Sequence, residues 1–264
     1  MKKLLTASTA ALAIAVALSS SVMAETAAQG DYVLSTQSAG GPLFASIFGA
    51  PSAMTPPART AFVSVSGANP RDGVQGNGWD YDMSYGYGFG NPFTAVGGMI
   101  SLDITGTQPY ADAGSFSLAF SRAVAITQNS VTFVGVSGSG LGAWAPSGVS
   151  AAKPAAAAMV SQYLTLGPSG YPVTWTVGYG ERSNYVGSTG LKDDGAFWGV
   201  GVGATSFMSL SVSGTENQVN AGANLAVPGL DGLSLAVGRY DLADKTDRQQ
   251  DAFTISYSMK LGAK

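Results

Sequence analysis

The sequence contains no cysteine and no histidine among its 264 residues. Without cysteine the chain forms no disulfide, carries no lipid anchor on a cysteine and offers no thiolate metal site. Without histidine, a Ser–His dyad or triad and a histidine-containing metal site are both excluded. These two absences remove most enzymatic chemistry, so no catalytic residue, metal site or cofactor is predicted.

Charged residues are also scarce, at 11% of the chain against about 25% in a typical soluble domain. The net charge is −3 and there is no basic patch, which argues against nucleic acid as a partner. A soluble protein needs charge on its surface, and little is available here. Beyond residue 24 the chain has no run of about 18 apolar residues, so transmembrane helices do not explain the low charge.

Three regions are expected along the chain. Residues 1–24 are typical of a secretory signal peptide, with Lys2 and Lys3 before an apolar stretch and a small-residue cleavage site ending at Ala24; an uncleaved anchor is the alternative. Residues 25–58 include the apolar stretch Pro42–Phe48, and three interpretations stay open for them: a plug inside a barrel, an extra strand or a periplasmic tail. Residues 59–264 carry the strand pattern.

What the sequence has in abundance is alternation between large and small residues. The stretch Trp79–Gly90 reads W-D-Y-D-M-S-Y-G-Y-G-F-G, with every second residue large and Asp, Ser or Gly between them. A period of two residues predicts a β-strand with two unlike faces. Similar stretches recur as far as Leu261 and predict about twelve strands, within a range of about 10–14. Several are roughly 9–11 residues long, which matches the hydrocarbon thickness of a bilayer when strands are tilted.

The expected connections alternate in length, with long ones such as 138–157 on one side and short ones such as 168–172 on the other. This alternation is typical of outer-membrane barrels, which have short periplasmic turns and long external loops. Together the features resemble the bacterial outer-membrane β-barrels, in particular the porin-like ones, over Arg59–Leu261. The resemblance implies an all-β, antiparallel up-and-down transmembrane barrel in the bacterial outer membrane.

Two other interpretations fit parts of the pattern. A soluble or secreted β-sandwich would bury the same rings in a core, yet its outer face should carry Lys and Glu rather than Gly and Ser. A Gly- and Tyr-rich fibre-forming segment fits Trp79–Gly90 alone but not the loop pattern. In a barrel, by contrast, the large apolar face meets lipid and the small face lines the lumen.

The barrel interpretation assigns residues to three places. The candidates for the lumen are Asp80, Asp82, Asp103, Arg122 and Lys260. The apolar segment Gly138–Ala157 is expected either to fold inward and narrow a pore or to form a surface or subunit contact. Its constriction candidates are Leu141, Trp144 and Lys153. The candidates for the interfacial aromatic girdle are Trp79, Tyr81, Phe89, Tyr179, Trp198, Tyr240 and Phe253.

The leading functional interpretation is a passive, porin-like channel for small hydrophilic solutes. The alternative is a non-conducting structural or adhesive barrel plugged by its N-terminal segment, and a barrel enzyme ranks third because histidine is missing. The expected partners are outer-membrane lipid and lipopolysaccharide, the barrel-insertion machinery and, in one alternative, further copies of the chain. The loop Asp241–Asp247 is expected to be solvated, with a divalent cation shared with lipopolysaccharide phosphates as the alternative.

Overall fold

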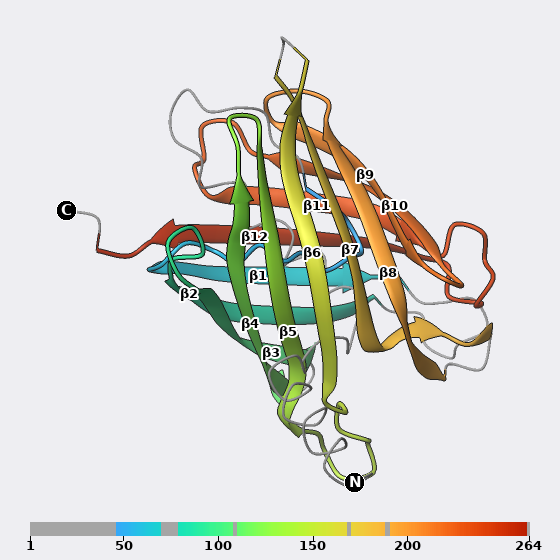
Figure 1. Ribbon diagram of the computed structural model, residues 1–264. Coiled ribbons are helices and arrows are strands. Elements are labelled where there is room, and N and C mark those ends of the chain that lie inside the picture. The colour runs from blue at the N-terminus through green and yellow to red at the C-terminus, as the bar shows by residue number, and fades with distance from the viewer. Residues whose placement is uncertain (1–45, 70–78, 108–109, 168–169, 188–190, 263–264) are drawn as a thin grey trace, which may run out of the picture.

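The computed structural model describes residues 46–69, 79–107, 110–167, 170–187 and 191–262. In this part of the chain, twelve strands form one closed barrel in which every strand pairs antiparallel with its sequence neighbours and β1 pairs with β12 (Figure 1). The strands are β1 (Thr60–Ala68), β2 (Asp80–Gly90), β3 (Gly97–Thr107), β4 (Tyr110–Ile126), β5 (Ser130–Trp144), β6 (Ala155–Leu166), β7 (Tyr171–Tyr185), β8 (Lys192–Gly203), β9 (Met208–Thr215), β10 (Val219–Ala226), β11 (Leu233–Tyr240) and β12 (Gln250–Lys260). The predicted all-β, up-and-down barrel of about twelve strands is confirmed. Within the described ranges, no helix is long and apolar enough to cross a membrane.

The barrel has two ends that differ in their connections. We call the end with residues 91–96, 127–129, 167–170, 204–207 and 227–232 the turn end, since these connections are all short. The opposite end, the loop end, carries the longer connections 145–154 and 241–249, together with one short connection, 216–218. Because β1 begins at the turn end and β12 finishes there, the chain enters and leaves the barrel on the same side.

Several strands extend farther toward the loop end than the sequence pattern indicates. β4 has 17 residues and β5 and β7 have 15 each, so parts of the segments expected as loops are paired strand instead. Gly138–Trp144, for example, belongs to β5. The region 196–214, where the alternation fits either two strands or one long strand, contains parts of two strands, β8 and β9, joined by the turn 204–207.

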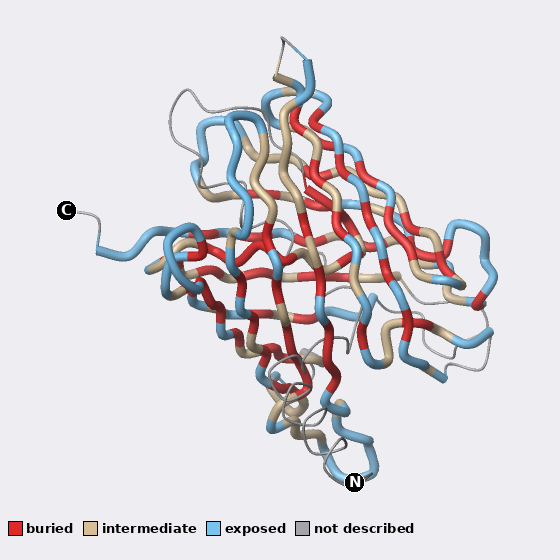
Figure 2. The backbone as a smooth tube through the Cα atoms, in the orientation of Figure 1, coloured by how far each residue is buried: buried red, intermediate tan, exposed pale blue. Residues whose placement is uncertain are grey.

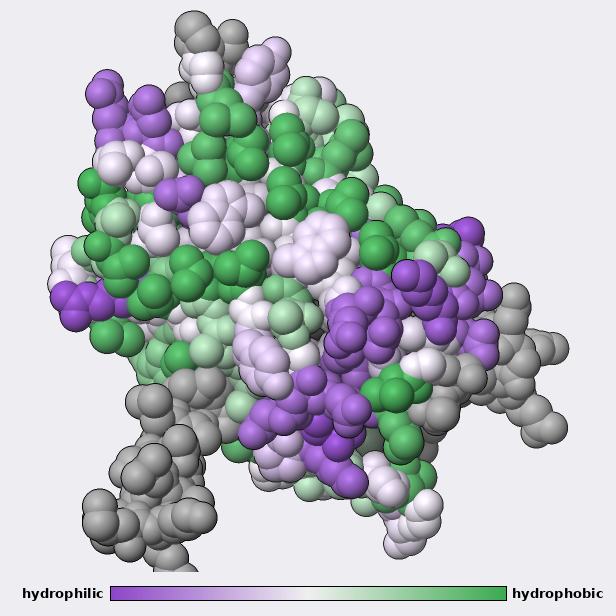
Figure 3. Space-filling model, turned by 45° about the vertical axis from the view of Figure 1, so that its right-hand side comes forward, coloured by the Kyte–Doolittle hydropathy of each residue, from purple (hydrophilic) through white to green (hydrophobic). Residues whose placement is uncertain are grey.

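The alternation in sequence becomes a barrel with large side chains outside and small ones inside. On β9, Ser209, Ser211 and Ser213 are buried, whereas Leu210 and Val212 between them are exposed. Figure 2 shows the same alternation of buried and exposed residues along most strands, and Figure 3 shows apolar side chains spread over one outer face. A soluble protein buries its large apolar residues, so the reversal indicates that the outer face is solvated by lipid.

The strands on two sides of the barrel run in different directions. In Figure 1, β1, β2 and β12 run steeply across the direction of β4–β8. Phe62 of β1 points inward and packs with Met99 of β3 and Ala119 of β4 in a buried apolar cluster. The Phe62 ring also lies over Gly86 of β2, so it fills the interior beside β1–β4.

Candidate functional site in the barrel lumen

The lumen is occupied by residues 46–58, which we call the internal segment. The segment precedes β1 and lies against the inner faces of β2–β6 and β8–β11, where its side chains and backbone contact the wall. Ile47, Phe48, Ala50 and Ala53 of the segment are each at most 2% exposed. The small face of the strands, which carries mainly Gly and Ser, thus faces polypeptide at these positions. Residues 1–45, including the predicted signal peptide and the rest of the region 25–58, lie outside the described residues.

The serines of β9 hydrogen-bond to the backbone of the internal segment. The Phe48 amide donates to Ser211 Oγ at 2.9 Å, and Ser213 Oγ donates to the Phe48 carbonyl at 2.6 Å. The Ser46 amide donates to Ser209 Oγ at 3.2 Å. An extended chain and a β-strand share the two-residue period, which explains why alternate segment residues meet alternate serines. These bonds satisfy buried backbone groups that water no longer reaches.

Glycines on the wall give the internal segment room to approach. A Cβ at Gly201 would lie 2.1 Å from the Ser46 carbonyl oxygen, and a Cβ at Gly199 would lie 2.6 Å from Ile47. The Phe48 ring rests on Gly222 and Gly238, where a Cβ would come within 2.5 Å and 2.7 Å of ring atoms. Any larger residue at these four positions would overlap the internal segment, so the glycines make the close approach of the segment possible.

The far half of the internal segment crosses to the opposite wall. The Ala53 amide donates to Ser161 Oγ of β6 at 2.8 Å, and the Thr55 and Ser121 hydroxyls are 2.6 Å apart. Ala53 also sits over Gly135 of β5, where a Cβ would lie 2.8 Å from its Cα. Ala53 and Met54 then join Phe133, Met159 and Phe197 in an apolar cluster inside the barrel. The segment consequently contacts both sides of the lumen.

The internal segment is re-entrant, because it enters and leaves at the turn end. Ser46 lies beside Ser209 and Gly201, next to the turn between β8 and β9. The chain then rises to Gly49, which lies beside Ser213 and Tyr240 nearer the loop end and adopts a φ of 77°. This left-handed conformation suits glycine at the tip of a bend, and the chain returns to the turn end at Pro57, beside Gly88.

A buried polar network continues from the tip of the internal segment to the loop end. Ser213 accepts a hydrogen bond from Asn220 Nδ2, and Asn220 Oδ1 accepts one from the Asp241 amide at 3.0 Å. The fully buried Asp241 carboxylate accepts from the Lys245 and Thr246 amides and from the Thr246 hydroxyl. The loop 241–249 is thereby held against the barrel end above Phe48.

The loop 241–249 does not gather metal ligands. The Asp241 carboxylate is engaged by backbone amides and a hydroxyl, and Asp244 and Asp247 occupy other positions of the loop at exposed sites. Over the described ranges, no cluster of three or more acidic residues is arranged to hold a metal ion. The order in this loop comes from hydrogen bonds to Asp241.

Three acidic lumen candidates share the inward register of β2 and β3 but differ in burial. Asp80 is the first residue of β2 and is exposed, Asp82 is 9% exposed, and Asp103 is 3% exposed. The Asp103 carboxylate accepts hydrogen bonds from the hydroxyls of Ser101 and Ser117. Hydroxyl donors replace water around this buried carboxyl group, so Asp103 is part of the inner wall.

The structure treats the two basic lumen candidates differently. Arg122 shares the outward register of Phe116, Leu118 and Phe120 on β4 and is exposed on the outer face. Its position follows from the strict two-residue period of β4, which puts Ser121 inside and Arg122 outside. Lys260 shares the inward register of Ser256 and Ser258 on β12, but it is the last residue of that strand and is exposed at the turn end.

The three constriction candidates lie at or beyond the loop end of β5, away from the internal segment. Leu141 pairs with Phe116 of β4, and the Trp144 indole N–H donates to the Ala111 carbonyl at 3.1 Å. Lys153 is exposed in the connection 145–154. Because β5 continues to Trp144, the connection is too short and too exposed to fill the lumen, and the internal segment occupies that place.

The aromatic candidates fall into two groups. Most lie on the outer face: Trp79, Tyr81, Tyr179 and Trp198 are exposed, and Phe89 and Phe253 are partly exposed. At the loop end, Trp79 and Tyr81 pack against Phe253 with ring centroids 5.6 Å and 6.4 Å apart. Tyr240 instead faces inward, is 4% exposed, and stacks on Phe48 at 4.7 Å.

Sequence reasoning missed the residues that hold the internal segment. These are Gly199, Gly201, Ser209, Ser211, Ser213, Gly222 and Phe48. Two signals were present: the small faces G-V-G-V-G and S-L-S-V-S on adjacent strands, and an apolar stretch ahead of the first strand. Their pairing depends on which strands face the same part of the lumen, which a two-residue period does not specify.

Comparison with known proteins finds similar chains among solved structures. No protein-family model and no curated protein matches it. Among solved structures it is similar to the KdgM porin, with 9% identity and a TM-score of 0.47 over 75% of this chain and 99% of that one. It is likewise similar to the NanC porin, with 10% identity and a TM-score of 0.47 over 75% and 100% of the two chains. A third similar structure is the outer membrane protein Omp33 of Acinetobacter baumannii, with 8% identity and a TM-score of 0.45 over 76% and 98%.

Proposed function

We propose that the protein is a porin-like barrel of the bacterial outer membrane whose pathway for small hydrophilic solutes is closed by its own internal segment. The observation that carries this proposal is the fit between the segment and the wall. Serine hydroxyls bond its backbone, and glycines lie beneath Ser46, Ile47 and Phe48. Glycine and serine on the inner wall do not contact lipid, so they do not stabilise the barrel in the membrane. They do leave room and hydrogen-bonding groups for a peptide that lies on the wall.

Reversible closure is supported by the kind of contact that the segment makes. Its hydrogen bonds go mainly to side-chain hydroxyls rather than to a strand ladder, so leaving the wall breaks no sheet pairing. Fixing each residue of an extended chain costs about 1–2 kcal/mol in conformational entropy, which opposes the burial of Phe48 and Ile47. The segment thus behaves as a removable plug rather than a thirteenth strand.

The experiment compares conductance in planar bilayers for the native protein and a variant lacking residues 46–57. We expect the native protein to stay mostly silent and the deletion variant to give discrete conductance steps. As a matched control, a variant lacking residues 146–153 of the exposed loop should stay as silent as the native protein. Heat-modifiable migration on gels confirms that each variant forms a barrel.

The outcomes separate the two candidate functions. Native protein that conducts continuously would show that the internal segment does not close the pathway. A correctly folded deletion variant that remains silent would favour the second candidate, a structural or adhesive barrel. That second candidate is supported by the ordered loop 241–249, in which backbone amides and the Thr246 hydroxyl donate to the buried Asp241 carboxylate.

A further inference from the structure

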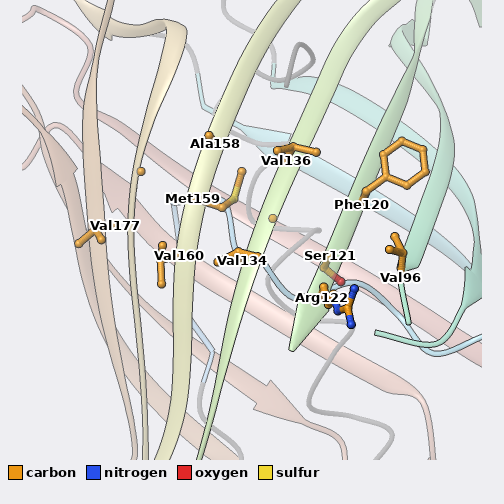
Figure 4. A pocket seen from close by; sticks show the side chains of 12 residues that line it. Val96, Phe120, Ser121, Arg122, Val134, Val136, Ala158, Met159, Val160 and Val177 are labelled. Atoms are coloured by element: carbon orange, nitrogen blue, oxygen red, sulfur yellow. The ribbon is translucent and has the colours of Figure 1, made fainter. Parts of the chain in front are cut away.

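A trough on the outer wall holds a single charged side chain. The trough has a volume of about 660 Å³ and lies over β4–β7, with Phe120, Val134, Val136, Ala158, Val160 and Val177 among its lining residues. Figure 4 shows Arg122 at one edge of this apolar surface, near Val96. The volume is within the range of roughly 300–1,000 Å³ that is usual for small-molecule sites.

The trough follows from the register of four neighbouring strands. In one cross-strand row, Phe120 is opposite Val136, Val136 is opposite Ala158, and Ala158 is opposite Tyr179. The rings at the two ends of this row stand above the small residues between them, so the surface dips at Ala158. The next row toward the turn end contains Arg122, Val134, Val160 and Val177, all paired in register.

Arg122 is an unusual residue for this position. It is exposed in the lipid-facing register of β4, and it is the one charged residue among those that line the trough. An arginine on the lipid face of a barrel costs about 2–4 kcal/mol at the midplane of the bilayer, and far less near the interface. Its long side chain reaches polar headgroups when the interface is close.

The next outward row marks that interface. Gln162 Nε2 donates to Thr132 Oγ1 at 2.9 Å, and the Trp175 indole N–H donates to Gln162 Oε1 at 3.0 Å. These three side chains lie one outward position nearer the turn end than Arg122 and its row. A polar row with an indole is typical of the headgroup level, so Arg122 lies just inside the hydrocarbon with phosphates within reach.

We propose that the trough binds one glycerophospholipid of the leaflet at the turn end. The Arg122 guanidinium holds the phosphodiester, for which its planar fork of donors is suited, and an acyl chain lies over Val136 and Ala158 beside the Phe120 ring. A second copy of the chain is a poorer occupant, because its apolar outer wall would bury Arg122 without an anionic partner. The inference requires that the barrel spans a bilayer, but it is independent of the internal segment.

The test is native mass spectrometry of the folded full chain in mild detergent, titrated with phosphatidylglycerol. We expect one lipid bound per barrel in the native protein, and about tenfold weaker binding after Arg122→Gln. Ala158→Leu fills the trough and should weaken binding to a similar degree. The matched controls are Arg59→Gln, an exposed arginine at the same end, and Ala223→Leu, an outward alanine on β10; both should bind lipid like the native protein.

Three results would overturn the proposal. Equal phosphatidylglycerol affinity in the native protein and the Arg122→Gln variant would remove the phosphate contact. Equal binding of a diacylglycerol with the same acyl chains would show that no phosphodiester is recognised. A stable dimer that Ala158→Leu disrupts would assign the trough to a second copy. Heat-modifiable migration verifies the fold of every variant, and conductance has no part in the readout.

Discussion

Replacing Phe48 by alanine should loosen the internal segment without unfolding the barrel. The ring is 1% exposed, stacks on Tyr240 and lies on Gly222 and Gly238. Truncating a buried phenylalanine costs about 3–5 kcal/mol of stability. Gly222 and Gly238 beneath the ring have no side chains that could move into the resulting cavity. Since Phe48 belongs to the internal segment, the lost free energy destabilises the segment bound in the lumen rather than the barrel itself. At about 1.4 kcal/mol per tenfold, the displaced population should rise by roughly 100-fold to several thousand-fold.

The absence of cysteine gives a direct assay for this prediction. In an Ala50→Cys variant the only thiol lies at a position that is 1% exposed in the lumen. Its labelling by a water-soluble thiol reagent therefore measures how often the segment leaves the wall. Adding Phe48→Ala should raise the labelling rate by the factor above and should lengthen the open time in planar bilayers.

The matched control for this experiment is Phe207→Ala, which removes an exposed ring in the turn 204–207 and should leave labelling unchanged. Two results would refute the reasoning. The first is fast labelling of the Ala50→Cys variant before Phe48 is changed, which would mean that the segment is not seated. The second is an unchanged labelling rate after Phe48→Ala, which would mean that the ring does not hold it.

Three further predictions test the wall, the loop end and the outer face. Ser211→Ala leaves the buried Phe48 amide without its acceptor, at a cost of about 1–3 kcal/mol. Thiol labelling should accelerate roughly 5- to 150-fold, whereas Ser256→Ala, which removes a buried hydroxyl without a partner in the described residues, should have no effect. Asp241→Ala removes the acceptor for the amides of Lys245, Thr246 and Arg248, so limited proteolysis at 242–249 should speed up while heat-modifiable migration is kept. Val212→Arg on the outer face of β9 should lower the free energy of unfolding in lipid vesicles by about 2–4 kcal/mol; a change under about 0.5 kcal/mol, as on a soluble surface, would argue against lipid contact.

The strands could be predicted from sequence because a two-residue period is a local property. Leu210 and Val212 against Ser209, Ser211 and Ser213 already define two faces, and the exposed and buried sides follow that division. The wrong predictions concern the end of one strand and the face of one residue, where the alternation of large and small residues is weak. β5 continues through Gly138–Trp144, where a Gly-rich stretch resembles a loop yet pairs with β4 and β6. The prediction that Arg122 lies in the lumen is wrong, because the two-residue period of β4 places its side chain outside.

By itself, the sequence determined the fold class, the number of strands and the reversal of large and small faces, since each depends on neighbouring residues in one strand. Only the tertiary structure decided what the small face is for. Ser46 meets Ser209 across 163 residues, and Phe48 finds Gly222 and Gly238 because β10 and β11 lie side by side. Such contacts depend on barrel closure and on where the chain bends at Gly49. An inner wall of glycine and serine can face either water or peptide, and the sequence of the strands does not say which. The tertiary structure shows that the internal segment lies against it.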